Sequence, residues 1–309
     1  MNSLTEFFFH LWPKIILKNK RAAFRNTIRR VTVSQRKRDL SSPSFREQTH
    51  VDPWAFIRVK NERSTLLASL ESIVPVIHRG VIAYNLAPGE YSDGSEKIIE
   101  AFCKQHPGFI PFHYPYYVEP AFSAEYLNKK LPFENTLAGY YSAALAQIPK
   151  NEWILKIDVD HIHHRDALLH SFYLPKSTKD IVNYSRLDVV RDKHDQLHVI
   201  TYRRPGDQLL IFNNDLSFYN NAGYLDNGEV YSFEVLTHGK RNIPYCPECM
   251  SMHFPFEKEG RSFPGNINKL PLLSEYLTEA DPEEFSEDFL TYYHYLKAFD
   301  DASKSLITQ

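Results

Sequence analysis

Two aspartates separated by one residue stand at the end of a predicted strand in this 309-residue chain. The run 152–161 (EWILKIDVDH) begins apolar and partly β-branched, which favours a buried strand, and then reaches Asp158 and Asp160. In an extended chain, side chains at i and i+2 share a face, so we expect both carboxylates on one side. Neighbouring carboxylates repel each other unless a cation lies between them. The pair therefore predicts a Mg²⁺ or Mn²⁺ half-site that waters and substrate phosphates complete.

A solvated strand end also accounts for a single Asp-x-Asp triplet, so the surrounding elements must decide between the two interpretations. Strands and helices alternate before the triplet, which predicts a mostly parallel sheet with right-handed crossovers. Ligands bind such sheets at the carboxyl ends of the strands, where Asp158 and Asp160 stand. The expected strands cover 53–59, 77–85, 109–114 and 153–157, and the expected helices cover 64–73, 96–105 and 135–147.

The second half of the chain predicts a different pattern. Short strand-like runs separated by turn residues indicate antiparallel pairing at 181–185, 187–191, 197–202 and 209–212. Residues 230–238 fit a short helix or strand, and 243–256 read as irregular. A last helix is expected from Asp281 to about Phe299, because Asp281 can cap it and Pro282 suits its first position.

Composition places the chain among soluble globular proteins, with 43% hydrophobic and 24% charged residues. Three cysteines argue against a disulfide framework and fit a reducing compartment. No apolar run approaches the roughly 18 residues that a membrane span needs, and the amino terminus has no secretory signal pattern. Aromatic residues reach 14%, a content that favours stacking on sugars or nucleobases.

The first 40 residues are basic and begin with an aromatic stretch. They hold ten Lys and Arg against two acids, a charge of +8, so the rest of the chain carries −10. Residues 3–17 (SLTEFFFHLWPKIIL) would sink into a lipid headgroup boundary while the cations meet anionic lipid. A basic arm or nucleic-acid tail is the alternative, but it has little use for three successive phenylalanines and Trp12. We therefore expect a membrane-associating segment and linker at 1–50, a catalytic domain at 51–272 and an acidic helical tail at 273–309.

Several segments together resemble a known family of bacterial enzymes. In order they are 53–62 (PWAFIRVKNE), 68–73 (ASLESI), 93–96 (DGSE) and 157–161 (IDVDH). This text is similar to bacterial β-1,4-N-acetylgalactosaminyltransferases that build ganglioside-like lipooligosaccharide outer cores. The likeness is dense over 53–185, thinner to 256, and weak before 50 and beyond 270. It implies an α/β, GT-A-type (Rossmann-like) nucleotide-sugar-binding fold with a mixed, mostly parallel sheet and a C-terminal helix. It also implies transfer of a sugar from UDP.

Expulsion of a diphosphate needs a cation that absorbs the developing charge. Asp160 is the expected direct ligand, with Asp158 binding the metal through water or reaching the ribose. The resemblance places His253, in a late His-Phe-Pro, as the third ligand. His161 and its neighbours His163 and His164 also lie close in sequence, where a structural role is the simpler interpretation.

The donor is expected at the end of the first strand. There Arg58 meets phosphate, Glu62 hydrogen-bonds ribose or base, and Asn61 lies between them, although a charged helix start also accounts for these residues. Asp93 resembles the uracil-reading aspartate of such folds. Lys156 and Asp158 complete the predicted donor-binding set.

Inversion at the sugar needs a general base that deprotonates the acceptor hydroxyl. Glu234 is the first candidate, both by resemblance and as an acid among aromatic residues, where partial burial would raise its pKa. Asp207 is the alternative base, and a helix-surface carboxylate is the remaining interpretation of Glu234. Cys246 and Cys249 have the spacing of a zinc knuckle, but one pair alone favours a tight turn with partly buried thiols.

The sequence thus predicts a metal-dependent inverting glycosyltransferase that moves GalNAc from UDP-GalNAc in β-1,4 linkage to a galactose, sialylated or unsialylated, of a lipooligosaccharide. We expect it on the cytoplasmic, inner face of the bacterial inner membrane, with no nucleic-acid partner. The alternatives are another UDP-hexose donor (GlcNAc, Gal or Glc), a sugar-phosphate nucleotidyltransferase, or a non-catalytic lectin-like or scaffold protein. A nucleotidyltransferase would normally begin with a Gly-rich phosphate loop, and none occurs near residue 60.

Overall fold

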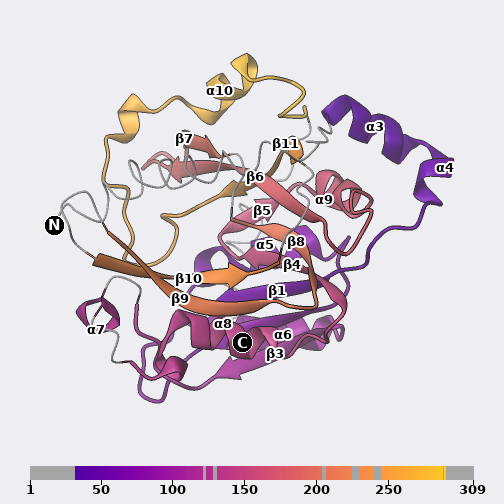
Figure 1. The fold of residues 1–309 in the computed structure, drawn as a ribbon. Helices are drawn as coiled ribbons and strands as arrows, with labels where there is room; N and C mark the ends of the chain where they lie inside the picture. Colours follow the sequence, from indigo (N-terminus) through magenta and orange to yellow (C-terminus); the bar gives the residue numbers. More distant parts are fainter. Residues whose placement is uncertain are drawn as a thin grey trace.

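Four parallel strands, β3, β2, β1 and β4, form one half of the central sheet (Figure 1). The computed structural model describes residues 32–120, 123–127, 131–203, 207–224, 230–239, 245–287 and 289. Among them, nine strands make one sheet in the order β3-β2-β1-β4-β8-β6-β11-β5, with β7 also paired to β6. Their bounds are β1 Trp54–Val59, β2 Gly80–Asn85, β3 Phe109–Tyr114, β4 Glu152–Asp158, β5 His161–His163, β6 Ile181–Arg191, β7 Leu197–Arg203, β8 Leu209–Asn213 and β11 Tyr245–His253.

The other half of the sheet is mixed. β8 is antiparallel to both β4 and β6, β7 is antiparallel to β6, and β11 is parallel to β6 but antiparallel to β5. A separate antiparallel hairpin of β9 (Ser217–Tyr224) and β10 (Val230–Thr237) lies against α8. This arrangement confirms the expected α/β, Rossmann-like class with a mixed sheet, and the expected antiparallel pairing in the second half.

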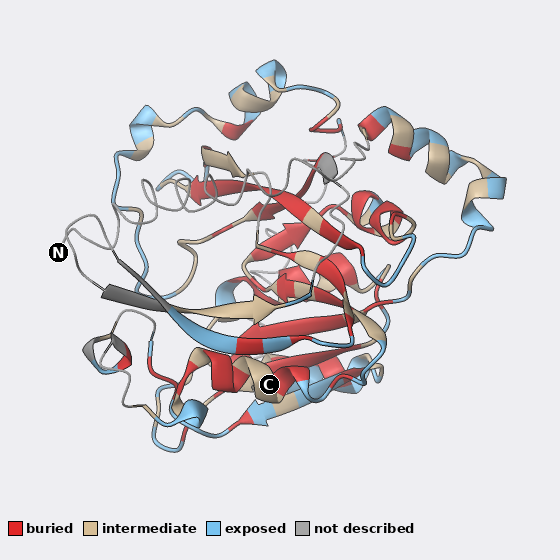
Figure 2. Cartoon of the chain, in the orientation of Figure 1, coloured by how far each residue is buried: buried red, intermediate tan, exposed pale blue. Residues whose placement is uncertain are grey.

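Helices cover both faces of the parallel half, which buries β1 on both sides. Ile57 packs in one cluster with residues of α5 and α6. The preceding residue, Phe56, packs in a second cluster with residues of α8 and β9. Strands buried on both faces read as continuous apolar runs, as WAFIRV does, and Figure 2 shows them as the buried centre of the domain. The helices are α3 Val33–Ser41, α4 Pro43–Arg46, α5 Arg63–Ile73, α6 Ser95–Gln105, α7 Ala124–Leu127, α8 Leu137–Leu145, α9 Arg165–Ser171 and α10 Leu273–Glu279, with short 3₁₀ turns η2 Phe133–Asn135 and η3 Ile267–Lys269.

Part of the segment expected to associate with a membrane packs on the domain. Helix α3 begins after the N-cap Thr32 and buries Arg36, whose Nε lies 2.9 Å from both carboxylate oxygens of the equally buried Glu248 on β11. Asp39 lies 3.0 Å from His170 on α9. Residues 1–31, which hold the aromatic stretch and most of the basic residues, lie outside the described residues. No helix in the described part of the chain has the length and apolar character needed to cross a bilayer.

The carboxyl-terminal segment also contacts the sheet. Helix α10 packs on β7, and Leu273, Phe285 and Phe289 join a third apolar cluster that includes Leu187 on β6. The carbonyl of Asp281 accepts hydrogen bonds from the next turn, but residues 282–287 form turns, and most of the helix expected to Phe299 lies outside the described residues.

Two local predictions differ from the structure. The runs expected as separate strands at 181–185 and 187–191 form one strand, β6. The stretch 243–256, expected to be irregular, contains strand β11, so that prediction is wrong. Prolines and polar residues interrupt its apolar alternation, and the pairing with β6 shifts register between Tyr245 and Cys249 and again before Ser251.

Candidate active site

The ends of β1 and β4 bring two cations onto one carboxylate. Arg58 and Asp158 are direct neighbours in the parallel pairing, and their side chains form an ion pair. The ammonium of Lys156 lies 3.3 Å from the second oxygen of Asp158 and donates to the carbonyl of Asp207 at 3.1 Å. The buried guanidinium of Arg58 also lies over the ring of Tyr141, 4.6 Å from its centroid. Asp158 is therefore held between Arg58 and Lys156.

Asp160 lies beyond the end of β4, in a turn, and meets two histidines. His253 at the end of β11 pairs with His161 at the start of β5, and the two rings stack with centroids 4.4 Å apart. His253 Nε2 lies 3.2 Å from one oxygen of Asp160, and His161 Nε2 lies 3.7 Å from the other. One ligand atom from each of the three residues lies within 4.8 Å of the others.

The donor set of these three residues fits a divalent cation. His161 Nδ1 is hydrogen-bonded to Ser251 Oγ at 2.9 Å, while its buried Nε2 has no hydrogen-bond partner among the described residues. Burial, and secondarily the nearby His253, holds the pKa of His161 well below its usual value, so the ring is neutral. A neutral imidazole nitrogen, a carboxylate and a second imidazole are ligands that Mn²⁺ accepts. Two of these residues, Asp160 and His253, were predicted as metal ligands, and the structure places His161 beside them. Asp158, the third predicted ligand, instead pairs with Arg58 and Lys156.

A second carboxylate holds His253 through the ring nitrogen that does not face Asp160. Its Nδ1 lies 2.7 Å from Asp188 on β6, and Asp188 in turn accepts from Arg186 Nε at 2.8 Å and from Arg203 Nε at 2.6 Å. Carboxylates in this position fix the tautomer and orientation of a metal-binding histidine. Burial opposes the charged ring, but the carboxylate of Asp160 outweighs it and raises the pKa of His253 to about 9. A metal ion would therefore bind Nε2 of His253 by displacing a proton. The same imidazolium holds the pKa of Asp160 below its usual range despite burial.

The two candidate bases lie in different electrostatic surroundings. Asp207 forms an ion pair with Arg186, and although burial disfavours its charged form, Arg186 and Lys156 hold its pKa well below the usual range. Glu234 is half-buried on strand β10, opposite Asn220, so it is not a helix-surface residue. Burial raises the pKa of Glu234, and Lys156 oppositely but more weakly favours its charged form. The raised pKa of Glu234 therefore suits a group that accepts a proton, whereas the carboxylate of Asp207 is held in an ion pair with Arg186.

The predicted donor-binding residues surround the end of β1. One carboxylate oxygen of Glu62 accepts a hydrogen bond from the ammonium of Lys258 at 2.7 Å, and the other is buried without a hydrogen-bond partner among the described residues. Burial raises the pKa of Glu62 to about 7. Asn61 adopts a positive φ of 53°, in the left-handed region, which turns the chain sharply after the strand. Asp93 accepts the backbone N–H groups of Arg63 and Ser95, both at 2.9 Å, and so joins α5 to α6. The nucleotide-binding roles of these residues stay predictions.

Sequence reasoning missed the residues that support the site. Arg186 and Asp188 are two apart on one strand, which places them on one face, and this spacing was the available signal. Their partners His253 and Asp207 are distant in sequence, so the spacing alone gives no role. Lys258 lies in a stretch without secondary structure and carried no signal.

The cysteine pair does not form the expected tight turn. Cys246 and Cys249 both belong to β11, and Cys249 is fully buried, which raises the pKa of its thiol. Among the described residues, the group with metal-ligand geometry contains no cysteine. The side chain of Cys246 lies outside the described residues.

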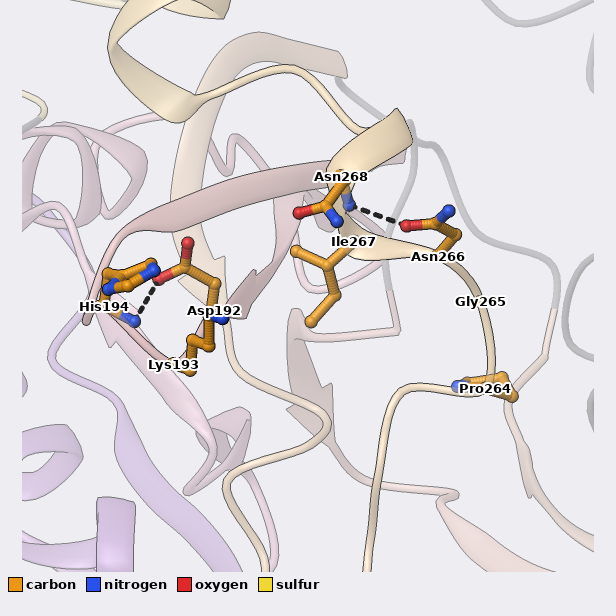
Figure 3. A pocket seen from close by; sticks show the side chains of 8 residues that line it. All are labelled: Asp192, Lys193, His194, Pro264, Gly265, Asn266, Ile267 and Asn268. Atoms are coloured by element: carbon orange, nitrogen blue, oxygen red, sulfur yellow. Dashed lines mark hydrogen bonds between the residues drawn. The ribbon is translucent and has the colours of Figure 1, made fainter.

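A separate, open hollow of about 870 Å³ shares no residue with this site (Figure 3). It lies between the β6–β7 turn, with Asp192 and His194, and the segment 264–268. Asp192 already accepts the backbone N–H groups of His194 and Gln196, both at 2.8 Å. Its carboxylate therefore stabilises the turn.

Comparisons with known proteins agree with the resemblance seen in the sequence. The family model described as beta-1,4-N-acetylgalactosaminyltransferase (CgtA) matches residues 38–275, which is 238 of the 309 residues. A search of curated proteins finds no match. Among solved structures, the crystal structure of HddC from Yersinia pseudotuberculosis matches with 13% identity and a TM-score of 0.26, over 58% of this chain and 75% of that one. That likeness is too distant to bear on function. The chain belongs to the β-1,4-N-acetylgalactosaminyltransferase (CgtA) family of glycosyltransferases.

Proposed function

We propose that the chain transfers GalNAc from UDP-GalNAc, with inversion and in β-1,4 linkage, to a galactose of a lipooligosaccharide outer core. The family supports a GalNAc transferase, and the site supports the chemistry. The observation that carries the proposal is the convergence of Asp160, His161 and His253 beside the cations at the ends of β1 and β4. A nucleoside diphosphate leaving group needs this combination of metal ligands and positive charge.

Asp160, His161 and His253 would hold a Mn²⁺ or Mg²⁺ ion, which when bound neutralises charge that develops on the departing diphosphate. Arg58 and Lys156 add two positive charges from the protein itself. Without substrate these cations hold Asp158. A bound diphosphate would compete with Asp158 for them, since phosphate and carboxylate present similar oxygen acceptors.

Glu234 would remove the proton from the acceptor hydroxyl as it attacks the sugar. Its partial burial favours proton uptake, and Arg58 and Lys156 are near enough to stabilise its charged form before the reaction. Asp207 could serve only by releasing Arg186. Glu234 is therefore the base that the charges around the site favour.

Residues 1–31 would place the enzyme on the cytoplasmic, inner face of the bacterial inner membrane, where a lipid-linked acceptor is displayed. Seven of the ten early Lys and Arg lie in this segment, apart from the buried pair that Arg36 makes, and each cation near an anionic surface contributes about 1 kcal/mol.

The donor and the linkage are tested together. The purified full chain is incubated with Mn²⁺, a lactose-terminated acceptor and, in separate reactions, UDP-GalNAc, UDP-GlcNAc, UDP-Gal and UDP-Glc. We expect transfer from UDP-GalNAc to dominate, and NMR of the product to show a β-1,4 bond to galactose. A preference for another donor, or an α-linked product, would contradict the proposal.

A further inference from the structure

Of the large aromatic side chains that are exposed in the described part of the chain, three belong to the loop after β3 and to the η2 turn. Tyr116 and Tyr117 follow β3 and are 51% and 47% exposed, and Phe133, which begins η2, is 52% exposed. Most other aromatic side chains in the described part of the domain are buried or half-buried. Exposed aromatic groups that lie together on a surface mark binding sites more often than isolated ones do.

The backbone that carries these rings is fixed by two asparagines. The buried side chain of Asn85, at the end of β2, donates to the carbonyl of Tyr116 at 2.7 Å. Asn135, at the end of η2, donates to the carbonyl of Tyr117 at 2.6 Å. The loop is therefore tied both to the parallel sheet and to the turn that presents Phe133. Rings held on a fixed backbone lose little further entropy when a ligand binds.

The tyrosine loop and η2 are also joined through Tyr114. Its hydroxyl donates to the carbonyl of Glu134 at 2.8 Å, and its ring packs against Tyr116 with centroids 5.3 Å apart. Tyr116, Tyr117 and Phe133 thus belong to one connected region, which we call the aromatic platform.

The platform leads toward the candidate base. The turn η2 contacts α8, which lies against the β9–β10 hairpin, and α7, which holds Glu125, contacts β10. The next residue of α7, Tyr126, donates its hydroxyl to Asn220 at 2.7 Å, and Asn220 is the direct partner of Glu234 across the β9–β10 hairpin. A ligand whose reacting hydroxyl reaches Glu234 would therefore extend over α7 to the platform.

The polar groups around the platform suit a neutral sugar. Glu119 follows Tyr117 in the same loop, and its N–H donates to the carbonyl of Asn135 at 3.0 Å. Burial, and after it the carboxylates of Glu119, Glu90 and Glu125, raise the pKa of the Tyr117 hydroxyl. Carboxylates accept hydrogen bonds from sugar hydroxyls, while aromatic faces pack against the apolar C–H face of the ring. Both features occur here, side by side.

We propose that the aromatic platform binds the neutral sugars of the acceptor oligosaccharide that precede the galactose at Glu234. The proposal rests on the proposed transfer to a galactose-containing acceptor, and it assigns that acceptor a second contact region. The same rings would also stack a uracil, which makes the nucleotide the occupant to be excluded by experiment.

The test compares Tyr117→Ala and Phe133→Ala with Tyr219→Ala. Tyr219 is 43% exposed, and it adjoins Asn220 on β9, so it lies on the opposite face of the hairpin from Asn220 and Glu234. The measurements are KM and kcat for a lactose-terminated acceptor, the Kd of UDP with Mn²⁺ by calorimetry, and the binding of free lactose by saturation-transfer NMR.

Each platform variant should raise the acceptor KM about tenfold, which corresponds to the loss of about 1.4 kcal/mol of stacking energy. The Kd of UDP, the kcat at saturation and every value for Tyr219→Ala should change by less than about twofold. Unchanged acceptor KM and lactose binding in both variants would overturn the proposal, and so would a loss of UDP binding, which would assign the rings to the nucleotide. If the wild type transfers nothing to galactosides, the proposed function fails. The saturation-transfer signal of free lactose still shows whether the aromatic platform binds sugar, because this binding does not require transfer of GalNAc.

Discussion

Replacing Glu234 with glutamine keeps the shape of the half-buried side chain and removes its ability to accept a proton. We expect kcat to fall by roughly 10²–10⁴, the usual effect of losing a general base, which corresponds to about 3–5 kcal/mol in the activation barrier. UDP binding should change little, because the metal group at Asp160 and the cations Arg58 and Lys156 remain. Single-turnover kinetics with a soluble galactoside acceptor and calorimetry with UDP measure the two effects separately.

The same variant changes the pH dependence in a defined direction. Burial raises the pKa of Glu234, so the wild type should lose kcat as the pH falls through a value above the ordinary glutamate pKa of about 4.3. A raised carboxyl pKa also means that the folded protein binds a proton more readily than the unfolded chain. This group therefore lowers the free energy of unfolding as the pH rises from its ordinary pKa to the raised one. Both effects should be absent from Glu234→Gln.

Asp207→Asn is the matched control. The change removes an ion pair with Arg186 from a carboxylate whose side chain is 36% exposed, so we expect the free energy of unfolding to fall by only about 1 kcal/mol. Its kcat should stay within about tenfold of the wild type. Glu234 is not the base if Asp207→Asn shows the large loss of kcat and Glu234→Gln does not.

Three further predictions concern the supporting residues. Asp188→Asn should weaken Mn²⁺ binding roughly 10–100-fold, the usual cost of losing a carboxylate that braces a metal-binding histidine; unchanged affinity by calorimetry would remove this role. Arg36→Ala should lower the free energy of unfolding by about 3–5 kcal/mol, because it leaves the buried carboxylate of Glu248 without its guanidinium partner. Arg38→Ala, at an exposed position, is the control, and a melting curve of Arg36→Ala equal to that of the wild type would contradict the prediction. Deletion of 1–31 should release the protein from anionic liposomes and spare activity on a soluble acceptor, whereas undiminished liposome binding would disprove the anchor.

Local patterns were sufficient to predict the parallel half of the fold. β3 has the predicted bounds, β1 begins one residue later than predicted, and β4 is one residue longer at each end. Apolar runs bounded by turn residues have few alternative structures. Strand β11 was not predictable in this way. It pairs with β6 and β5, which are distant in sequence, and this pairing makes a strand of a segment whose own pattern is interrupted by proline and cysteine.

The candidate site could be predicted in its residue types but not in its pairings. Asp158 and Asp160 were expected side by side, but β4 ends at Asp158, so the alternation stops and each carboxylate takes its own partners. Asp160 meets His253, 93 residues away, only because β11 lies beside β5. His161 follows Asp160 directly and was undervalued, because its role depends on the orphaned Nε2 that only the fold reveals.

Transfer of GalNAc measured with and without a divalent cation decides whether Asp160, His161 and His253 hold a metal ion that the reaction needs. The wild type, Asp160→Ala and the exposed control Asp195→Ala are assayed with UDP-GalNAc and a lactose-terminated acceptor, in Mn²⁺ and again in EDTA. We expect that EDTA abolishes transfer by the wild type and that Mn²⁺ restores it. Asp160→Ala should remain folded but inactive in both conditions, while Asp195→Ala should behave as the wild type. Full activity of the wild type in EDTA, or of Asp160→Ala in Mn²⁺, would contradict this expectation.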